Sequence, residues 1–149
     1  MATNVTRLLR QRKIAFTEHH YEANPQLTAE EIAAKVGLDP KRVFKTLVTV
    51  GKSGQHYVFV VPSQGRLDLR KAAQAAGEKF VELIPQKELL PLTGYVHGGC
   101  SPIGMKKELP TFVDASCLNF PTIAISAGKV GSQVELDIRP LQFPTAQLC

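Results

Sequence analysis

The chain has 149 residues, of which 44% are hydrophobic and 21% are charged. This balance is typical of one globular domain and excludes a disordered chain. No apolar run approaches the roughly 18 residues that a membrane span needs, and the N-terminus lacks the apolar core of a secretory signal. We therefore expect a single domain over residues 1–149 that stays in the cytoplasm, with no membrane partner.

The chain contains three cysteines, Cys100, Cys117 and Cys149, with no C-x-x-C pair. An odd number without such a pair argues against both a disulfide framework and a zinc ribbon. His97 and Cys100 have a spacing that could supply two metal ligands, but no second pair follows them. We expect no metal and no cofactor.

The net charge is +5 at pH 7, which is compatible with a polyanionic partner such as RNA. Basic residues gather at two places, with Arg7 and Arg10 in the first segment and Lys106 and Lys107 in the second half. The two groups could meet a phosphate backbone from different sides. The alternative is a solvated face of an amphipathic helix and a polar turn.

Residues 1–42 predict mainly helix. Thr3 or Asn4 can cap a first helix, and Thr28-Ala-Glu-Glu31 is a capping box that opens a second one. The expected elements are, in chain order, a helix over residues 3–13, a strand over 14–22, a helix that follows the capping box and stops at Gly37, and a short helical turn that starts at Asp39-Pro40.

A β-hairpin is the next expected element. Residues 43–50 and 57–61 are rich in β-branched and aromatic residues, and Gly51-Lys-Ser-Gly54 supplies the connection between them. Alternation along the first strand places Lys45 on the same face as Leu47. Lys45 is therefore either an edge charge in water or a cation drawn partly into a pocket, where it could bind a carbonyl oxygen or a terminal phosphate.

The remaining chain predicts short helices and strands separated by glycine and proline. We expect a helix over 68–76 ended by Gly77, a strand over 80–84, a helical turn over 85–90, and strands over 94–97, 111–113, 122–126 and 133–138. Many short strands with a few helices predict a mixed α+β fold, in which a curled sheet carries helices on its outside.

The candidate site is the glycine-rich loop Gly98-Gly-Cys-Ser-Pro-Ile-Gly-Met-Lys-Lys107. Its three glycines, Gly98, Gly99 and Gly104, free the backbone to expose N–H groups. Beside Ser101, such groups could hold an anion or a developing oxyanion. The alternative is an ordinary surface turn, which uses the same residue types.

Asp137 poses a similar choice near the end of the chain. In Val134-Glu-Leu-Asp-Ile138 the apolar residues alternate away from the acidic ones. That pattern predicts a polar outer face with Asp137 paired to Arg139. Only a specific fold could turn this carboxylate inward.

Four strings, taken in order, resemble the YbaK/EbsC family of aminoacyl-tRNA deacylases, which is related to the editing insertion domain of bacterial prolyl-tRNA synthetase. They are Val43-Phe-Lys-Thr-Leu-Val48, the loop over 98–107, Leu109-Pro-Thr-Phe112 and Ile125-Ser-Ala-Gly128. The resemblance runs from the first helix to about Leu141. It implies a free-standing domain that removes cysteine mischarged onto tRNA, chiefly proline tRNA, in a largely antiparallel, barrel-like mixed sheet with helices packed outside.

The resemblance also implies roles for individual residues. Lys45 is the catalytic lysine, near the ester and the terminal adenosine, while Gly98 and Pro102 are the fixed points of a loop that shapes the amino-acid pocket. Tyr21, Gly99, Ser101, Gly104 and Asp137 complete the implied pocket, with Asp137 meeting the substrate ammonium group. We expect the loop to face Lys45 across one pocket, and Arg7, Arg10, Lys106 and Lys107 to contact tRNA.

No Ser-His-Asp order or convincing Cys-His pair supplies a nucleophile. Cys100 remains an alternative nucleophile, with His97 three residues before it. For the resembled family, the proposed nucleophile is the thiol of the substrate cysteine, which attacks its own ester and releases tRNA and a thiolactone. Lys45 and the N–H groups of the loop would then stabilise the oxyanion.

One segment departs from the family pattern. Residues 22–27, Glu-Ala-Asn-Pro-Gln-Leu, are shorter than is common and lack an aromatic residue, which could widen the pocket or leave it to be closed by Leu27. A small change in pocket volume alters discrimination by about 1–3 kcal/mol. Two alternatives therefore stay open, a deacylase for alanine or another small residue and a non-catalytic module that binds RNA or prolyl-tRNA synthetase.

Overall fold

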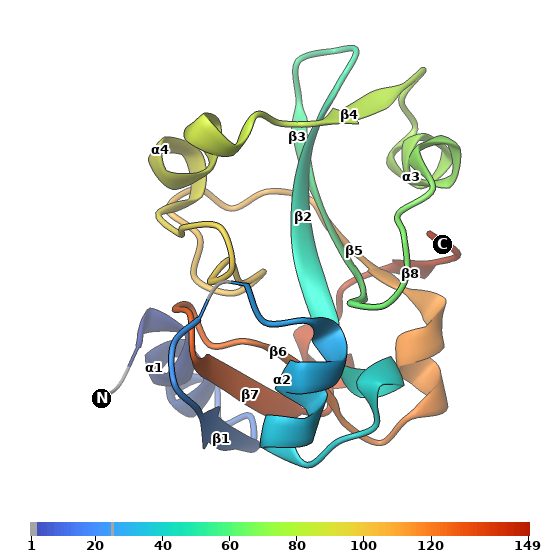
Figure 1. Cartoon of the computed structure of the whole chain (residues 1–149). Coiled ribbons are helices and arrows are strands. Elements are labelled where there is room, and N and C mark those ends of the chain that lie inside the picture. Colours follow the sequence, from blue (N-terminus) through green and yellow to red (C-terminus); the bar gives the residue numbers. More distant parts are fainter. Residues whose placement is uncertain (1–2, 25) are drawn as a thin grey trace.

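The computed structural model describes residues 3–24 and 26–149 (Figure 1). Pro25, which belongs to the departing segment over 22–27, lies outside the described residues. The helices are α1 (Asn4–Gln11), α2 (Ala29–Val36), α3 (Leu69–Ala76) and α4 (Leu89–Thr93), with the 3-10 turns η1 (Pro40–Arg42), η2 (Gln86–Glu88), η3 (Ala115–Asn119) and η4 (Arg139–Leu141). None of the described helices is long and apolar enough to cross a membrane.

The strands form two open sheets. One has the order β1-β7-β6 and is antiparallel throughout, and the other has the order β4-β2-β3-β5-β8 with parallel pairing of β5 to β3 and to β8. The bounds are β1 (Phe16–His20), β2 (Phe44–Gly51), β3 (His56–Pro62), β4 (Val81–Leu83), β5 (Thr111–Asp114), β6 (Ile123–Ser126), β7 (Ser132–Leu136) and β8 (Thr145–Ala146).

The predicted α+β class with largely antiparallel strands is confirmed, but the predicted barrel-like closure is wrong. A barrel needs continuous ladders around its whole circumference. Here the edge strands β4 and β8 have only three and two residues, and the parallel bridge between Val43 and Ala124 is the isolated bridge that joins the two sheets in the described chain. In the described chain the two sheets are therefore joined by this bridge and do not close into one barrel.

The predicted hairpin is confirmed, with Phe44 opposite Pro62 and Val50 opposite His56. Its two faces enter different parts of the core, as strand alternation requires. Phe44 and Val48 pack with the main hydrophobic cluster, whereas Leu47 packs with a second cluster under α3. In Figure 1 this hairpin stands between α3 and α4. Lys45 consequently points away from the main cluster.

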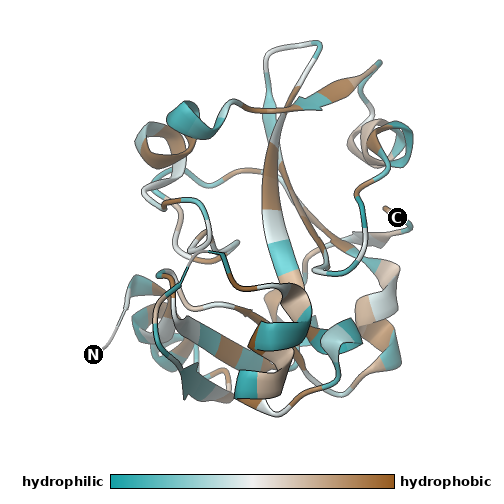
Figure 2. Ribbon diagram, viewed as in Figure 1, coloured by the Kyte–Doolittle hydropathy of each residue, from teal (hydrophilic) through white to brown (hydrophobic). Residues whose placement is uncertain are grey.

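Helices α1 and α2 cover opposite faces of the three-stranded sheet. Val5 and Leu9 of α1 are completely buried in the cluster that holds Val134, whereas Ala33 of α2 packs in a third cluster with Ala124. Figure 2 shows that both helices carry hydrophilic and hydrophobic residues, as amphipathic helices do. Two layers of helix therefore enclose this sheet.

The sequence signals for helix ends are confirmed. Thr3 caps α1, Thr28 and Glu31 form the capping box of α2, and Asp39 caps η1. Helices α2 and α3 end at Gly37 and Gly77, which both adopt the left-handed conformation.

One predicted strand does not form. Residues 94–97 are irregular, because Gly94 ends α4 in the left-handed conformation and Gly98 has φ +85°. Two left-handed glycines so close together turn the chain out of an extended path. The short strand β8, by contrast, was not predicted; it adds to the edge of β5.

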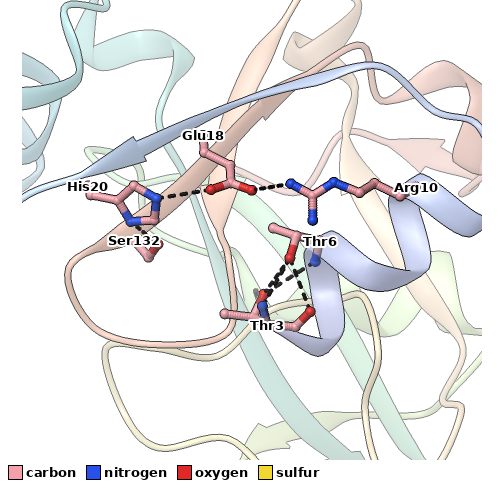
Figure 3. A network of polar contacts seen from close by, with 6 residues as sticks. All are labelled: Thr3, Thr6, Arg10, Glu18, His20 and Ser132. Atoms are coloured by element: carbon pink, nitrogen blue, oxygen red, sulfur yellow. Dashed lines mark hydrogen bonds and ion pairs between the residues drawn. The ribbon is translucent and has the colours of Figure 1, made fainter. Parts of the chain in front are cut away.

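A polar network ties α1 to the three-stranded sheet (Figure 3). Arg10 of α1 pairs with Glu18 at 2.8 Å, and Glu18 also contacts His20 Nε2 at 3.0 Å. His20 Nδ1 lies 2.9 Å from the Ser132 hydroxyl. The hydrogen bond from His20, followed by that from Arg10, lowers the pKa of Glu18.

We expect Glu18→Gln to destabilise the fold by about 0.2–1 kcal/mol at pH 7, the range of an exposed ion pair. Because the folded pKa lies below the unfolded value of about 4.5, this stabilisation is present above that pH and is lost as the pH falls through the folded pKa. Urea unfolding at pH 7 and pH 3 measures the difference. Glu82→Gln, at an exposed residue of β4, is the control, and an equal loss in both variants would contradict the assignment.

Candidate active site

The glycine-rich loop connects α4 to β5 and packs into the protein. Ser101 is completely buried, and Pro102 and Ile103 are buried beside it. The Ser101 hydroxyl accepts a hydrogen bond from the Ile103 N–H at 3.3 Å, and Tyr95 donates its hydroxyl to the Ile103 carbonyl. Gly98 itself is exposed. The loop is thus a packed segment with an exposed tip, and the Ser101 side chain stabilises the loop's own conformation.

The loop lies directly against the turn between β6 and β7. A Cβ atom on Gly99 would stand 3.0 Å from Lys129 Cα and from the Val130 nitrogen, so the close approach requires glycine. At the other end of this turn, Gly131 approaches the backbone of Tyr21, and the Tyr21 N–H donates to the Gly131 carbonyl at 2.9 Å. The turn therefore lies between the glycine-rich loop and the end of β1.

Tyr21 and Gln133 form a side-chain pair at this end of β1. The Gln133 amide Nε2 donates to the Tyr21 hydroxyl at 3.2 Å. Burial raises the pKa of Tyr21, so the phenol stays protonated near neutral pH. Gln133 is opposite Ser126 in the β6–β7 register, and both are more than nine-tenths buried.

Gln133 and Ser126 are absent from the predicted site. Alternation does place Gln133 on the polar face of its strand with Glu135. Alternation does not show that other segments cover this face. The cover comes from the Tyr21 segment and from α2, which are far away in sequence. A polar residue on a covered face has no signature in a single sequence.

Lys45 is half-buried. Its ammonium donates to the Gly65 carbonyl at 2.8 Å. Burial lowers the pKa of Lys45 most, the nearby Arg66 lowers it further, and Cys149 acts in the opposite direction. By alternation Lys45 shares the face of Val43, which bridges to Ala124 of β6. A partly desolvated cation thus lies two residues from the junction of the two sheets.

A cavity of about 910 Å³ lies between α1, the glycine-rich loop and the segment over 141–144. Pro102 and Gly104 line it together with residues of α1 and of the segment over 141–144, but Lys45 is not among the described residues that line it. The loop instead lies against the turn of the β6–β7 hairpin, and Lys45 follows two residues after Val43, which bridges to β6.

Asp137 lies outside the group around Tyr21. Its carboxylate forms a two-pronged ion pair with the Arg139 guanidinium, at 2.9 Å and 2.8 Å. These hydrogen bonds lower the pKa of Asp137. The pairing with Arg139 is the one that strand alternation predicts, and it leaves this carboxylate satisfied at the surface.

The two predicted basic groups lie on segments that touch. The Asn4 amide of α1 donates to the Gly104 carbonyl at 3.0 Å, two residues before Lys106. Arg7, Arg10, Lys106 and Lys107 are all exposed. Arg10 also lies over the Phe16 ring, 5.3 Å from its centre. Exposed cations from α1 and the loop could therefore follow one phosphate backbone.

Burial makes the loop cysteine a poor nucleophile. It raises the pKa of Cys100 to about 12 and that of Cys117 to about 11. The reactive form of cysteine is the thiolate, which is scarce at neutral pH for such groups. In the part of the chain that the structure describes, no cluster of three His, Cys, Asp or Glu side chains could hold a metal ion.

Comparison with known proteins reveals close relatives. The family model of the aminoacyl-tRNA editing domain matches residues 23–143. EbsC of Enterococcus faecalis, provisionally named a Cys-tRNA(Pro)/Cys-tRNA(Cys) deacylase, is 44% identical over 135 residues, which cover 90% of this chain and 82% of EbsC. A proline–tRNA ligase of Shouchella clausii is 27% identical over 104 residues, 70% of this chain but 18% of the ligase.

A solved structure shares the fold over almost its whole length. It is a crystal structure provisionally described as a trans-editing enzyme for prolyl-tRNA synthetase, with 27% sequence identity and a TM-score of 0.82. The match covers 99% of this chain and 98% of that one.

We expect iodoacetamide at pH 8 to alkylate Cys149 more than about tenfold faster than Cys100 or Cys117, because Cys149 is exposed and the other two are buried with raised pKa values. Mass spectrometry of tryptic peptides after timed quenching gives the three rates. In guanidinium chloride the rates should become similar. Fast alkylation of Cys100 in the folded protein would show an activated thiolate instead.

Proposed function

Since this chain belongs to the aminoacyl-tRNA editing domain family and is therefore an aminoacyl-tRNA deacylase, we propose that it clears cysteine mischarged onto proline tRNA. The name of EbsC, which is 44% identical, supports this substrate. The likeness to part of a proline–tRNA ligase supports the proline tRNA and makes the synthetase a candidate partner.

The buried state of Cys100 is the observation that supports a substrate-derived nucleophile. With a thiol pKa of about 12 in the loop, the protein offers little thiolate there at neutral pH. In the proposed reaction the substrate cysteine thiol gives up its proton, and its sulfur bonds to the ester carbonyl carbon. The carbon–oxygen bond to the ribose then breaks and the ribose oxygen takes up a proton. Water finally opens the thiolactone to cysteine.

Lys45 is proposed as the group that stabilises charge on the reacting ester. Its ammonium is already half-desolvated, and in a low-dielectric site a cation interacts more strongly with a developing oxyanion. The carbonyl of Gly65 holds it in place at 2.8 Å. Gly98, which is exposed at the tip of the loop, could contribute its backbone N–H from that side.

Arg7, Arg10, Lys106 and Lys107 are proposed to contact the tRNA backbone. All are exposed, and the Asn4–Gly104 hydrogen bond holds their two segments together. Such contacts position a nucleic acid without reading its sequence. Selection of the proline tRNA would then depend on recognition of its acceptor end or on the synthetase.

A deacylation panel tests the proposed substrate. Proline tRNA charged with cysteine, serine, alanine or proline is incubated with the protein, and the remaining ester is followed by acid precipitation. We expect cysteine to be removed at least about tenfold faster than serine or alanine, since only cysteine carries a thiol for near-attack. Preference for alanine would contradict the substrate-thiol mechanism, and an unchanged ester half-life with bound tRNA would indicate a non-catalytic module.

Two substitutions test the assignment of the reacting groups. Lys45→Ala should lower kcat/KM on Cys-tRNA(Pro) by about 100-fold or more, the usual effect of removing a group that stabilises an oxyanion. Cys100→Ala should leave it within about threefold, because the buried thiol stays protonated. Lys52→Ala, in the exposed hairpin turn, is the matched control. The reverse pattern would restore Cys100 as the nucleophile.

A further inference from the structure

A polar network lies beside the backbone bridge that joins the two sheets. Arg42, the last residue of η1, donates its Nε to the Thr122 carbonyl at 3.0 Å and its Nη2 to the Thr122 hydroxyl. That hydroxyl donates to Glu135 Oε2 at 2.7 Å, and Arg42 Nη2 lies 3.6 Å from the same carboxylate oxygen. His19 Nε2 contacts the other oxygen, Glu135 Oε1, at 3.0 Å. Segments that are distant in sequence therefore meet at the Glu135 carboxylate.

The network is placed at the junction itself. Arg42 immediately precedes Val43, and Glu135 lies opposite Ala124 in the β6–β7 register. The side chains of Arg42 and Glu135 are only 23% and 21% exposed, and the guanidinium also lies over the Phe120 ring, 5.9 Å from its centre. Charged groups that are partly withdrawn from water form stronger hydrogen bonds than neutral groups or groups in solvent. The network thus adds a directional contact between the two sheets.

The other contacts at this junction define its geometry less tightly. Val43 and Ala124 form an isolated bridge, and the described strands contribute no shared ladder between the two sheets. The cluster that covers the bridge is aliphatic, with Ala33 and Val36 of α2, and hydrophobic contact is non-directional. A planar guanidinium bound to a carbonyl, a hydroxyl and a carboxylate instead restricts both distance and orientation. Arg42 is therefore the group that best defines how β2 lies against β6.

We propose that Arg42 is a positioning residue for the deacylation reaction, which together with Glu135 fixes Lys45 of β2 relative to the β6–β7 hairpin. This inference rests on the proposed deacylase function. Lys45 follows three residues after Arg42, whereas the hairpin, which belongs to the other sheet, lies against the glycine-rich loop at Gly99. The two sides of the proposed site thus belong to different sheets. Because a displacement of about 1 Å in a reacting group can lower a rate about 100-fold, a loose junction would weaken the contact of Lys45 with the oxyanion.

Two substitutions test this role by kinetics on Cys-tRNA(Pro). Arg42→Ala removes the guanidinium and should lower kcat about 10-fold or more, and Glu135→Gln, which removes the paired charge, should lower kcat to a smaller extent. KM should stay within about threefold, since an interaction used in the transition state alone changes kcat and not KM. Arg70→Ala on α3 and Glu78→Gln are the matched controls, and the second weakens a similar carboxylate network at the turn of the β2–β3 hairpin.

A double substitution shows whether Arg42 acts through Lys45. Added to Lys45→Ala, the Arg42→Ala change should lower single-turnover kcat by less than about twofold, because two residues that act on one step are not additive. A residue that merely stabilises the fold would instead cause the same loss in both backgrounds.

A further measurement reports the position of Lys45 without any substrate. Timed acetylation with an N-hydroxysuccinimide ester, followed by mass spectrometry, gives the rate of Lys45 relative to Lys52 in the exposed hairpin turn. We expect this ratio to rise about threefold or more in Arg42→Ala, because local opening at the junction frees the ammonium that the Gly65 carbonyl holds.

An unchanged acetylation ratio would overturn the inference, as would an equal loss of kcat in the wild-type and Lys45→Ala backgrounds. A rise in KM with kcat unchanged would assign Arg42 to tRNA binding and overturn it too. Thermal unfolding checks that each variant folds, and Glu135→Gln decides by the same measurements if Arg42→Ala does not. Acetylation needs no tRNA, so it stays informative if the wild-type protein fails to remove cysteine from proline tRNA, the result that would contradict the proposed function.

Discussion

The junction between Val43 and Ala124 is the contact on which the site depends. It joins two sheets that otherwise carry separate hydrogen-bond ladders. Beyond this bridge no further bridge joins the two sheets in the described chain, so a residue just past it is paired within its own sheet alone. Lys45 and Ser126 each lie two residues past the bridge, on β2 and β6. In a closed barrel the ladder between β2 and β6 would continue past the bridge.

The local parts of this architecture could be predicted, because their causes are local. Thr28, Gly37 and Gly77 act on neighbouring backbone groups, and the hairpin follows from its own turn and alternation. Features that depend on contacts between distant residues have weaker signals in the sequence. The predicted strand over 94–97 does not form because Gly94 and Gly98 turn the chain. The burial of Gln133 could not be predicted because the residues that cover it are far away in sequence.

Cys100 illustrates that residue type alone does not identify a nucleophile. A thiol in a glycine-rich loop suggests a nucleophile, yet its burial raises the pKa to about 12. Lys45, which the sequence offers as either an edge charge or a cation in a pocket, is instead half-desolvated by burial. Groups at functional sites often have pKa values shifted in this way.

The hydrogen bond from Asn4 to the Gly104 carbonyl has a mechanical consequence. It fastens the first turn of α1 to the middle of the glycine-rich loop, and Gly104 leaves no room for a side chain between them. The position of the loop at Gly104 is therefore tied to that of α1. A nucleic acid bound to this helix would act on the loop through that hydrogen bond.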